Sequence, residues 1–406
     1  MIKTLKTALA FLVAHRRKTW AIVASVALGV TALFLVGGYY EYNYWGLKQS
    51  LIRSQYGHLQ LYPEGYRETR DADPFARSFE RPDELVEFLR AEPDVRTVAR
   101  RSRAMGVISG VPVEIWGVEP ENEDELFSFT AKREGTSLSS DDALSCQMSH
   151  AFAEKLGVGL GDTVSASGVR VDGQLNRLDL TVQSLASGYA EEFNLMVVTV
   201  PVRAFRDLFG TDATHEIAVL FRDDANLGNT RDALAARLSD AGWKADIALW
   251  YEQAAYFRQV VSYYQGFYRV VLAIVAVIVF FATGTTMALS LLERTREFGT
   301  LMSMGARRPS LVAEILCEAL LAGVIGLAAG SALSAVLASA INAAGGIRMP
   351  AAPGMATGIQ VNIIYSPQAA ALSIVTALAV PVVAVILPAR RIMAQSVVRL
   401  LDKGEK

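Results

Sequence analysis

Four long apolar stretches dominate the pattern of this 406-residue chain. Each is long enough for a helical membrane span, which needs about 20 predominantly apolar residues, and charged side chains are nearly absent from the centres. The stretches are Trp20–Gly38, Gly266–Leu292, Leu311–Ala340 and Gln368–Leu387. The interval between the first two carries charges throughout. We therefore predict a membrane α-helical protein with four transmembrane helices and a large domain between the first and second helices.

The interval between the first two spans contains both strand-like and helical stretches. The predicted strands are His58–Tyr62, Val111–Val118, Thr163–Ala166, Arg177–Leu185, Leu195–Val200, Glu216–Phe221 and Ala245–Leu249. The predicted helices are Pro82–Ala91, Gln147–Leu156, Pro201–Phe209 and Thr230–Ala241. We expect an α+β domain that is long enough for two subdomains.

Lysine and arginine are unevenly distributed among the short segments outside the spans. Residues 1–19, the segment 293–310 and the tail after Leu387 are basic, whereas 342–367 carries only Arg348. The positive-inside rule places both termini and the 293–310 loop in the cytoplasm, and the large domain outside. Residues 1–18 are predicted to form an amphipathic interfacial helix, and the alternative is a frayed terminus. The predicted membrane helices are 19–41, 264–292, 311–341 and 367–388. The remaining segments are the large domain (42–263), a cytoplasmic loop (293–310), a short outer loop (342–366) and a cytoplasmic tail (389–406).

Composition argues against several classes of function. The net charge of −2, without a concentrated basic patch, gives no indication of nucleic-acid binding. The two cysteines and four scattered histidines lack the spacing of a metal site. No phosphate-binding G-x-x-x-x-G-K-[ST] segment, G-x-S-x-G segment or pair of catalytic carboxylates can be placed. We expect a non-catalytic chain that binds no cofactor or metal, and we interpret the charges of the large domain as a solvated surface.

The charged loop between the second and third spans contains a candidate helix. Thr295 is a candidate N-cap, and Gly305 is a candidate C-terminal cap. Phe298, Leu301 and Met302 share one face at spacings i, i+3 and i+4, as an anchor for a groove on a partner would. The alternative is a solvated turn whose charges only follow the positive-inside rule.

This loop and the third span together carry a family signature, which consists of an E-R-T-R-E-[IF]-G run, a Gly-Ala pair, a glutamate in an apolar helix and spaced glycines. In this sequence the parts are Glu293–Gly299, Gly305-Ala306, Glu318, and Gly323, Gly326 and Gly330. The pattern resembles that of the FtsX/MacB-like permeases, the membrane subunits of type VII ABC transporters, which include the lipoprotein-releasing LolC and LolE. Weaker matches are Trp116–Pro120, Ala153–Thr163, Ser187–Phe193 and Pro388–Arg391. The tail departs at Gln395-Ser396, where the family usually has Asp-Pro.

The resemblance implies that the loop couples this chain to a cytoplasmic ATPase. The implied coupling residues are Glu293, Arg294, Thr295, Arg296, Glu297, Phe298, Gly299, Leu301, Met302, Gly305 and Ala306. The implied partners are a dimer of ABC ATPase subunits that bind ATP and magnesium, a second permease subunit that is identical or a paralogue, and a periplasmic partner or lipoprotein. The implied location is the bacterial inner membrane, in contact with lipid, with the large domain in the periplasm.

The family's activities leave two alternatives for function. In the first, the ATPase drives movements of the periplasmic domains by mechanotransmission, and these extrude or release a lipoprotein, a lipid or a hydrophobic small molecule. In the second, an FtsX-like signalling subunit regulates periplasmic cell-wall hydrolases. The outer domain of the signalling members is typically smaller than the one here, which favours transport.

Two acidic residues, Glu314 and Glu318, lie one turn apart near the cytoplasmic end of the third span. A carboxylate deep in hydrocarbon costs about 2–3 kcal/mol. We expect both at interface depth and paired with an arginine, and the alternative is a proton or substrate path. The candidate partners are Arg294, Arg307 and Arg308. The same span carries spaced small residues that permit close helix packing, namely Gly323, Gly326 and Gly330.

The segment from Tyr251 to Leu292 contains no proline and only two glycines, Gly266 and Gly284. We expect one continuous helix from the large domain into the second span, which would act as a rigid lever. The alternative is a helix broken near Gly266 and Tyr268.

Overall fold

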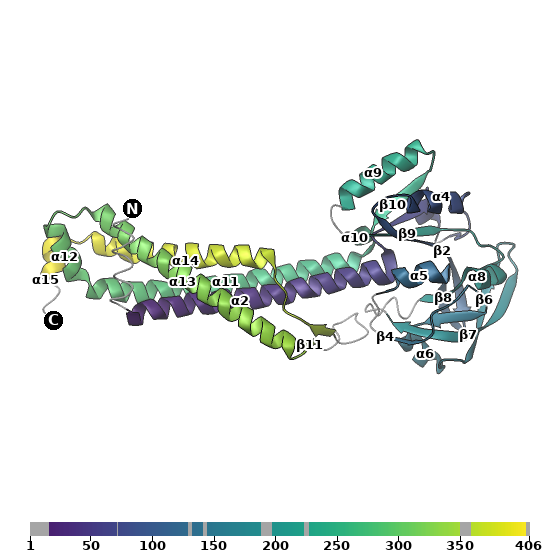
Figure 1. The fold of residues 1–406 in the computed structure, drawn as a ribbon, viewed down its shortest axis with the longest axis horizontal. Helices are drawn as coiled ribbons and strands as arrows, with labels where there is room; N and C mark the ends of the chain where they lie inside the picture. Colours follow the sequence, from purple (N-terminus) through teal and green to yellow (C-terminus); the bar gives the residue numbers. More distant parts are fainter. Residues whose placement is uncertain are drawn as a thin grey trace. The chain divides into compact units, whose positions relative to one another are not determined.

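The computed structural model describes residues 16–70, 72–128, 132–140, 144–187, 197–222, 227–349 and 359–402 (Figure 1). The chain forms two compact units, and each is described by itself. The membrane unit contains residues up to 44, 261–348 and residues from 360 onward, and the α+β domain is built mainly from residues 45–260. Of the interfacial helix predicted at 1–18, residues 1–15 lie outside the described residues.

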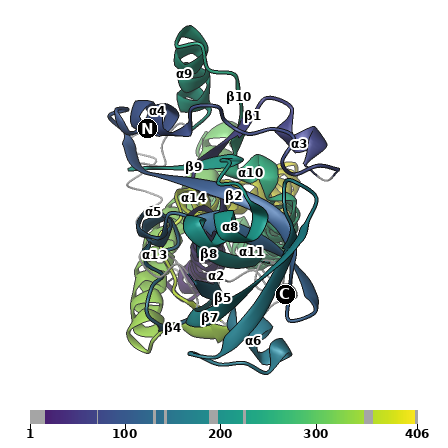
Figure 2. The ribbon, with the colours of Figure 1, turned by 90° about the vertical axis from the view of Figure 1, so that its right-hand side faces the viewer.

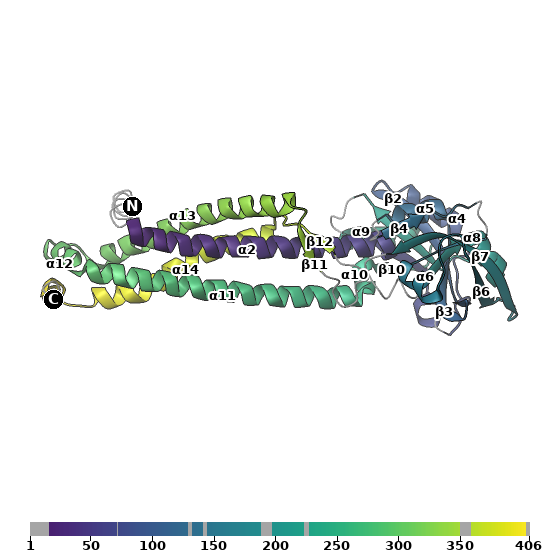
Figure 3. The ribbon, with the colours of Figure 1, turned by 90° about the horizontal axis from the view of Figure 1, so that it is seen from below.

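Four long helices supply the core of the membrane unit (Figure 3). They are α2 (Arg16–Leu51), α11 (Ala255–Glu293), α13 (Arg308–Ala343) and α14 (Pro367–Met393). Each contains one of the predicted apolar stretches and is long and apolar enough to cross a membrane. The described residues therefore contain four candidate membrane helices, as predicted.

Small residues bring the helices of this unit close together. A Cβ atom added to Gly326 of α13 would lie 2.7 Å from the Cβ of Val26 in α2, and one added to Gly330 would lie 2.6 Å from the carbonyl oxygen of Ala27. Gly323, on the same helix, meets the backbone of α14 instead. The hydroxyl of Thr31 also donates to the Gly330 carbonyl at 3.1 Å. Side chains at these glycines would force α13 away from both neighbours.

Shorter elements complete the membrane unit. They are α12 (Thr295–Ser303), α15 (Val397–Asp402), and the paired strands β11 (Ile347–Met349) and β12 (Ile359–Val361). Ser366 begins α14 as its N-cap, because its hydroxyl oxygen accepts a hydrogen bond from the Ala369 amide at 3.3 Å. The same hydroxyl donates to Glu41 of α2 at 2.9 Å, so the cap also joins two helices.

The helix predicted from Tyr251 to Leu292 is interrupted near its start. A short helix, α10 (Trp250–Gln253), ends before Ala254, whose backbone angles of φ −82° and ψ 76° are not helical. The predicted continuity is therefore wrong at Ala254, and it is confirmed from Ala255 to Glu293. The sheet sets the direction of α10, because the amide of Trp250 donates to the carbonyl of His58 at 3.2 Å.

Among the described residues, ten strands form one mixed sheet in the α+β domain (Figure 2). The strands are β1 (Leu59–Pro63), β2 (Val95–Ile108), β3 (Val111–Val118), β4 (Lys132–Gly135), β5 (Ser145–Met148), β6 (Thr163–Val169), β7 (Leu175–Ser187), β8 (Val197–Pro201), β9 (Glu216–Phe221) and β10 (Ala245–Leu249). Their order is β10-β1-β9-β2-β3-β8-β5-β7-β4, and β6 pairs with β2 and β7. The pairs β3–β8 and β5–β7 are parallel.

Helices pack on this sheet over two separate apolar cores. The helices are the π-helix η1 (Ile52–Tyr56), α3 (Tyr66–Thr69), α4 (Pro82–Arg90), α5 (Pro120–Leu126), α6 (His150–Leu156), α8 (Val202–Phe209), α9 (Leu227–Asp240) and α10. One core unites β1, β9 and β10 with α4 and α9, and includes Leu59, Leu85 and Leu234. The other unites β3 and β5 to β8 with α6 and α8, and includes Phe152 and Phe205.

The seven predicted strands are all present, but β2, β4 and β5 were not predicted. The omission of β2 is the most serious, because this strand joins β9 to β3 at the centre of the sheet. Four of its 14 residues are arginines, which gives it the composition of a solvated segment. The helix predicted at Gln147–Leu156 begins only at His150, after a Ser149 N-cap, because Gln147 and Met148 pair in β5.

The charges of the α+β domain are not all solvated, contrary to expectation. The side chains of Arg101 in β2 and Glu216 in β9 are 0% exposed and form an ion pair of 2.8 Å. Arg103 binds Glu216 at 2.6 Å and Glu114 in β3 at 2.9 Å. The two arginines also lie over the ring of Trp116, each with its guanidinium carbon 4.5 Å from the ring centre. Ion pairing compensates for the loss of water at these buried charges.

A buried histidine lies beside this cluster. The His215 Nδ1 atom accepts a hydrogen bond from the Arg103 amide at 3.0 Å, and its ring stacks on Tyr66 with the ring centres 5.4 Å apart. Burial and the positive charge of Arg103 lower the pKa of His215 to about 4. An unfolded histidine has a pKa of about 6.5, so between these values the unfolded chain binds more protons than the folded chain. The free energy of unfolding therefore falls as pH falls through this interval, by up to about 3 kcal/mol.

We predict that His215→Gln removes most of this pH dependence, because glutamine does not titrate. The measurement is the denaturation midpoint of the detergent-solubilised protein at pH 8, 6 and 5, followed by tryptophan fluorescence. His150→Gln is the control, because His150 is only partly buried and its variant should retain most of the slope. Equal slopes in the wild type and the His215 variant would contradict the prediction.

Candidate coupling site

The charged loop between α11 and α13 folds as the short helix α12, which begins immediately after the end of α11. Its N-cap is Arg294, and no side chain caps the first turn. The prediction that Thr295 is the cap is therefore wrong. Thr295 is the first helical residue, and its hydroxyl donates backward to the carbonyl of Leu292 at 2.9 Å, which ties α12 to the end of α11.

The C-terminal cap predicted at Gly305 is confirmed. Gly305 has a φ of +94°, in the left-handed region that favours glycine. Its amide donates to the carbonyl of Met302 at 3.1 Å, and the amide of Ala306 donates to the carbonyl of Leu301 at 3.0 Å. These two bonds form a Schellman motif, which ends α12 and turns the chain toward α13.

A buried arginine joins α12 to the third span. Arg294 is 3% exposed, and its guanidinium donates to Glu318 of α13 at 3.1 Å and to Glu297 of α12 at 3.2 Å. The guanidinium also lies 5.1 Å from the centre of the Phe298 ring. The predicted ion pair of Glu318 with an arginine is therefore present. The prediction is wrong for Glu314, one turn earlier, which forms no ion pair among the described residues and has a buried Oε1 atom without a hydrogen-bond partner there.

The apolar face of α12 points into this chain, contrary to the prediction that it docks on a partner. Phe298 is 2% exposed and belongs to the core of the membrane unit, with Ile315 of α13, Ile392 of α14 and Leu400 of α15. Leu301 and Met302 are half-buried against the same core. The other helices of the chain cover this apolar face because removing apolar surface from water lowers the free energy.

The opposite face of α12 is exposed and mostly polar. Met304, at the end of the helix, is 71% exposed. The exposed residues of this face are Arg296, Glu297, Thr300, Ser303 and Met304. Arg296 and Glu297 were predicted as coupling residues, whereas the last three were missed. Their signal was the polar spacing at Arg296, Thr300 and Ser303, which marks the face opposite Phe298.

The remaining predicted coupling residues lie around this helix. Glu293 is exposed at the end of α11 and pairs with Lys18 of α2. Gly299 is buried, and Ala306 is half-buried against the core. Together with Arg294 and Thr295 they belong to the base of α12 and not to its exposed face.

The departure from the family pattern at Gln395-Ser396 still yields a capped helix. The Ser396 hydroxyl accepts a hydrogen bond from the Arg399 amide at 3.4 Å, at the start of α15. Leu400 of α15 is buried in the core that contains Phe298. Arg308, at the start of α13, donates to the Gln395 carbonyl at 3.4 Å. The tail therefore packs against the apolar face of α12.

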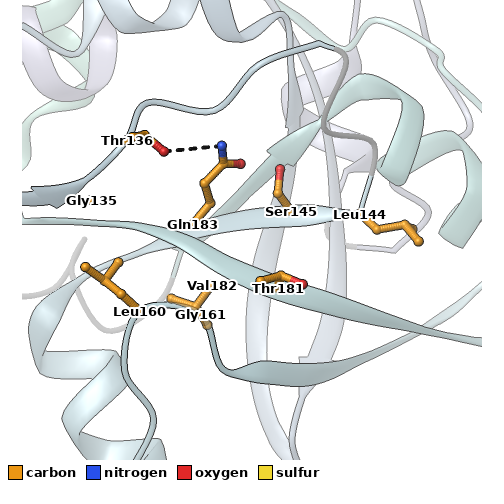
Figure 4. Close-up of a pocket in the computed structure, with 9 residues that line it drawn as sticks. All are labelled: Gly135, Thr136, Leu144, Ser145, Leu160, Gly161, Thr181, Val182 and Gln183. Carbon is orange, nitrogen blue, oxygen red and sulfur yellow. Dashed lines mark hydrogen bonds between the residues drawn. The ribbon is translucent and has the colours of Figure 1, made fainter.

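A second candidate site is an open cavity of about 710 Å³ in the α+β domain (Figure 4). Its apolar lining includes Leu144, Leu160 and Val182. The amide of Gln183 donates to the hydroxyl of Thr136 at 3.4 Å across one wall. None of the described lining residues is charged, so the cavity offers contact to an apolar molecule.

Two protein-family models match the chain. The FtsX-like permease C-terminal model matches residues 269–397, which include α12, and the MacB-like periplasmic core domain model matches residues 19–237. The chain belongs to the FtsX/MacB-like permeases of type VII ABC transporters. The second model covers more than half of the chain.

Curated relatives support the same family. The macrolide export ATP-binding/permease protein MacB of Neisseria gonorrhoeae is 28% identical over 152 residues, which are 36% of this chain and 23% of the relative. MacB 2 of Yersinia pestis is 28% identical over 152 residues, or 36% and 22% of the two chains. MacB of Nitrobacter winogradskyi is 30% identical over 143 residues, or 34% and 22%. The matched region is thus less than a quarter of each relative.

Two solved structures show a weaker likeness. The periplasmic region of MacB from Actinobacillus actinomycetemcomitans is 14% identical, with a TM-score of 0.36, and the match covers 52% of this chain and 95% of that one. The extracellular domain of the noncanonic ABC-type transporter YknZ from Gram-positive bacteria is 17% identical, with a TM-score of 0.34 and coverage of 47% and 98%. TM-scores below 0.5 carry no conclusion about fold or function.

We predict that Glu318→Ala loosens α12, because it leaves the buried Arg294 without its partner on α13. Breaking a buried ion pair by removing one partner costs about 3–5 kcal/mol. The measurement is amide hydrogen exchange of residues 295–303, which should accelerate. Glu314→Ala is the matched control one turn away and should leave this exchange unchanged. Equal effects of the two substitutions would refute the assignment.

Proposed function

We propose that this chain is the permease subunit of an ATP-driven transporter, and that α12 receives force from a separate cytoplasmic ATPase. The observation that carries the proposal is the division of α12 into two faces. One face is fixed to the chain's own core through Phe298, Leu301 and Met302. The other face is exposed. A helix that transmits force needs both a rigid base and a free surface.

The base of α12 restrains it from several directions. Arg294 joins it to α13, the Schellman motif at Gly305 fixes its end, and Leu400 of α15 shares the core beneath it. A push on the exposed face would therefore move the membrane helices together with α12 instead of bending it. The basic composition of the 293–310 loop supports a cytoplasmic position, where an ATPase is available.

The chemistry of the exposed face indicates the kind of groove that would receive it. Arg296 and Glu297 supply charges of both signs next to each other, and Met304 supplies an exposed apolar tip. A complementary groove would offer both an acidic and a basic group around a small apolar pocket. The ATPase partner, the paired permease subunit and the inner-membrane location with cytoplasmic termini belong to the same proposal.

We predict that the double substitution Arg296→Glu and Met304→Asp prevents the ATPase from binding, because it reverses one charge and places another at the apolar tip. The measurement is co-purification of an ABC ATPase with the tagged chain from detergent-solubilised membranes of the native host, identified by mass spectrometry. Arg203→Glu on α8, where Arg203 is exposed, is the matched control and should retain the ATPase. Undiminished ATPase in the double variant would overturn the proposed role of this face.

The proposed cargo is amphipathic or hydrophobic: a lipoprotein, a lipid or a hydrophobic small molecule. Exposed apolar side chains at one end of the sheet support this. Val169 of β6 pairs directly with Leu175 of β7, and Leu175 is 78% exposed. Met105 and Val107 of β2 are also exposed, and Val107 pairs with β6 two residues before Val169. A contiguous apolar surface on a water-facing domain marks an interaction site.

We predict that the double substitution Val169→Ser and Leu175→Ser impairs the response to cargo and leaves the ATPase bound. ATP hydrolysis by the purified complex should respond to an extract of membrane lipids and lipoproteins in the wild type and lose most of that stimulation in the variant. The basal rate should be unchanged. Full stimulation of the variant would contradict the assignment, and co-purification of a cell-wall hydrolase with the wild type would favour the signalling alternative.

A further inference from the structure

Both chain segments that connect the α+β domain to long helices contain a break in the backbone. After α2, the π-helix η1 is kinked at Arg53, whose angles are φ −101° and ψ 20°. Before α11, the chain leaves helical geometry at Ala254. A displacement of either long helix could therefore be absorbed by bending at these two points.

One buried network of hydrogen bonds holds both segments on the domain side of these breaks. The side-chain amide of Gln253, the last residue of α10, donates to Oε1 of Gln60 in β1 at 3.0 Å. The amide of Gln60 donates to Oε1 of Glu216 in β9 at 2.7 Å. Arg101 of β2 donates through Nη1 to the same oxygen at 2.8 Å and also to the backbone carbonyl of Gln55 in η1. The hydrogen-bond network thus extends from α10 to η1 across three neighbouring strands.

The central charges of this network are all paired. Each carboxylate oxygen of Glu216 accepts from an arginine, because Arg103 occupies Oε2 at 2.6 Å. All three nitrogens of the Arg101 guanidinium donate, since Nε and Nη2 bind Glu123 of α5 at 3.1 Å and 2.6 Å. A buried network of paired charges resists displacement, because moving one member would leave a charge unpaired away from water.

Tyr62 reinforces the link to α10. Its hydroxyl accepts from the amide of Gln253 at 2.8 Å and donates to Oε1 of Gln60 at 2.6 Å. Gln253, Gln60 and Tyr62 therefore form a closed triangle of hydrogen bonds. Gln60 and Tyr62 are buried on β1, directly beside β9, which carries Glu216.

We infer that this network, centred on Arg101 and Glu216, anchors both connecting segments to three neighbouring strands of the sheet, β1, β9 and β2. Its members are positioning residues. Because the anchor takes hold on the domain side of each break, η1 and α10 stay fixed to β1, β9 and β2 when a long helix bends at Arg53 or Ala254. The mechanical role rests on the proposed function, whereas the anchoring itself does not.

The test is hydrogen exchange of the full-length protein in lipid nanodiscs. Glu216→Gln removes the charge that holds both arginines, and exchange should accelerate about tenfold or more at both 52–58 and 250–256. Gln253→Leu breaks only one end and should accelerate 250–256 alone. Glu125→Gln is the matched control, because Glu125 forms an exposed ion pair of 2.7 Å with Arg96, which lies on β2 as Arg101 does. It should leave both segments unchanged.

The selectivity of these effects separates an anchor from a general stabilising role. Wild-type exchange at both segments in Glu216→Gln would overturn the inference, as would equal acceleration throughout the sheet in Gln253→Leu. If Glu216→Gln fails to fold, Gln253→Leu still decides the matter. None of these outcomes depends on the ATPase, so loss of the proposed function would leave the anchor standing.

Discussion

A charge that leaves water must keep a partner, and this constraint organises both units of the protein. In the α+β domain the constraint falls on Arg101 and Glu216, and in the membrane unit on Arg294 and Glu318. Each pair joins elements that are distant in the sequence. Separating such a pair costs several kcal/mol, so the joined elements have few alternative arrangements. The same pairs lie where the molecule connects its parts: at the base of α12 and between η1 and α10.

Packing in the membrane unit provides the support on which α12 depends. Lipid gives helices no hydrophobic reason to associate, so close contact relies on small residues and interhelical hydrogen bonds. Gly326, Gly330 and the hydroxyl of Thr31 provide these between α13 and α2. Ile315 of α13 and Ile392 of α14 belong to the core that encloses Phe298, and α12 thereby gains a fixed base. Its polar face remains free because charged and hydroxyl side chains gain nothing from burial without partners.

The sequence predicted the regular parts of the fold better than its centre. Strands such as β3 and β9 have strongly apolar composition, and their predicted bounds agree with the structure. Strand β2 was missed, although it joins the two halves of the sheet, because its arginines resemble those of a solvated segment. Only neighbours from other strands reveal that Arg101 and Arg103 are paired. At the candidate coupling site, the helix and its Gly305 cap were predictable, whereas the direction in which Phe298 points was not.

Some features of this protein follow from local sequence, and others depend on contacts between residues that are distant in the sequence. The sequence by itself indicated the four candidate membrane helices, because the hydropathy of about 20 consecutive residues decides insertion. It also determined the family, through the motif from Glu293 to Gly299. Only the tertiary structure decided which charges are buried and which face of α12 is free. Arg101 and Glu216 are 115 residues apart, and no local pattern records a contact made between residues that the fold alone brings together.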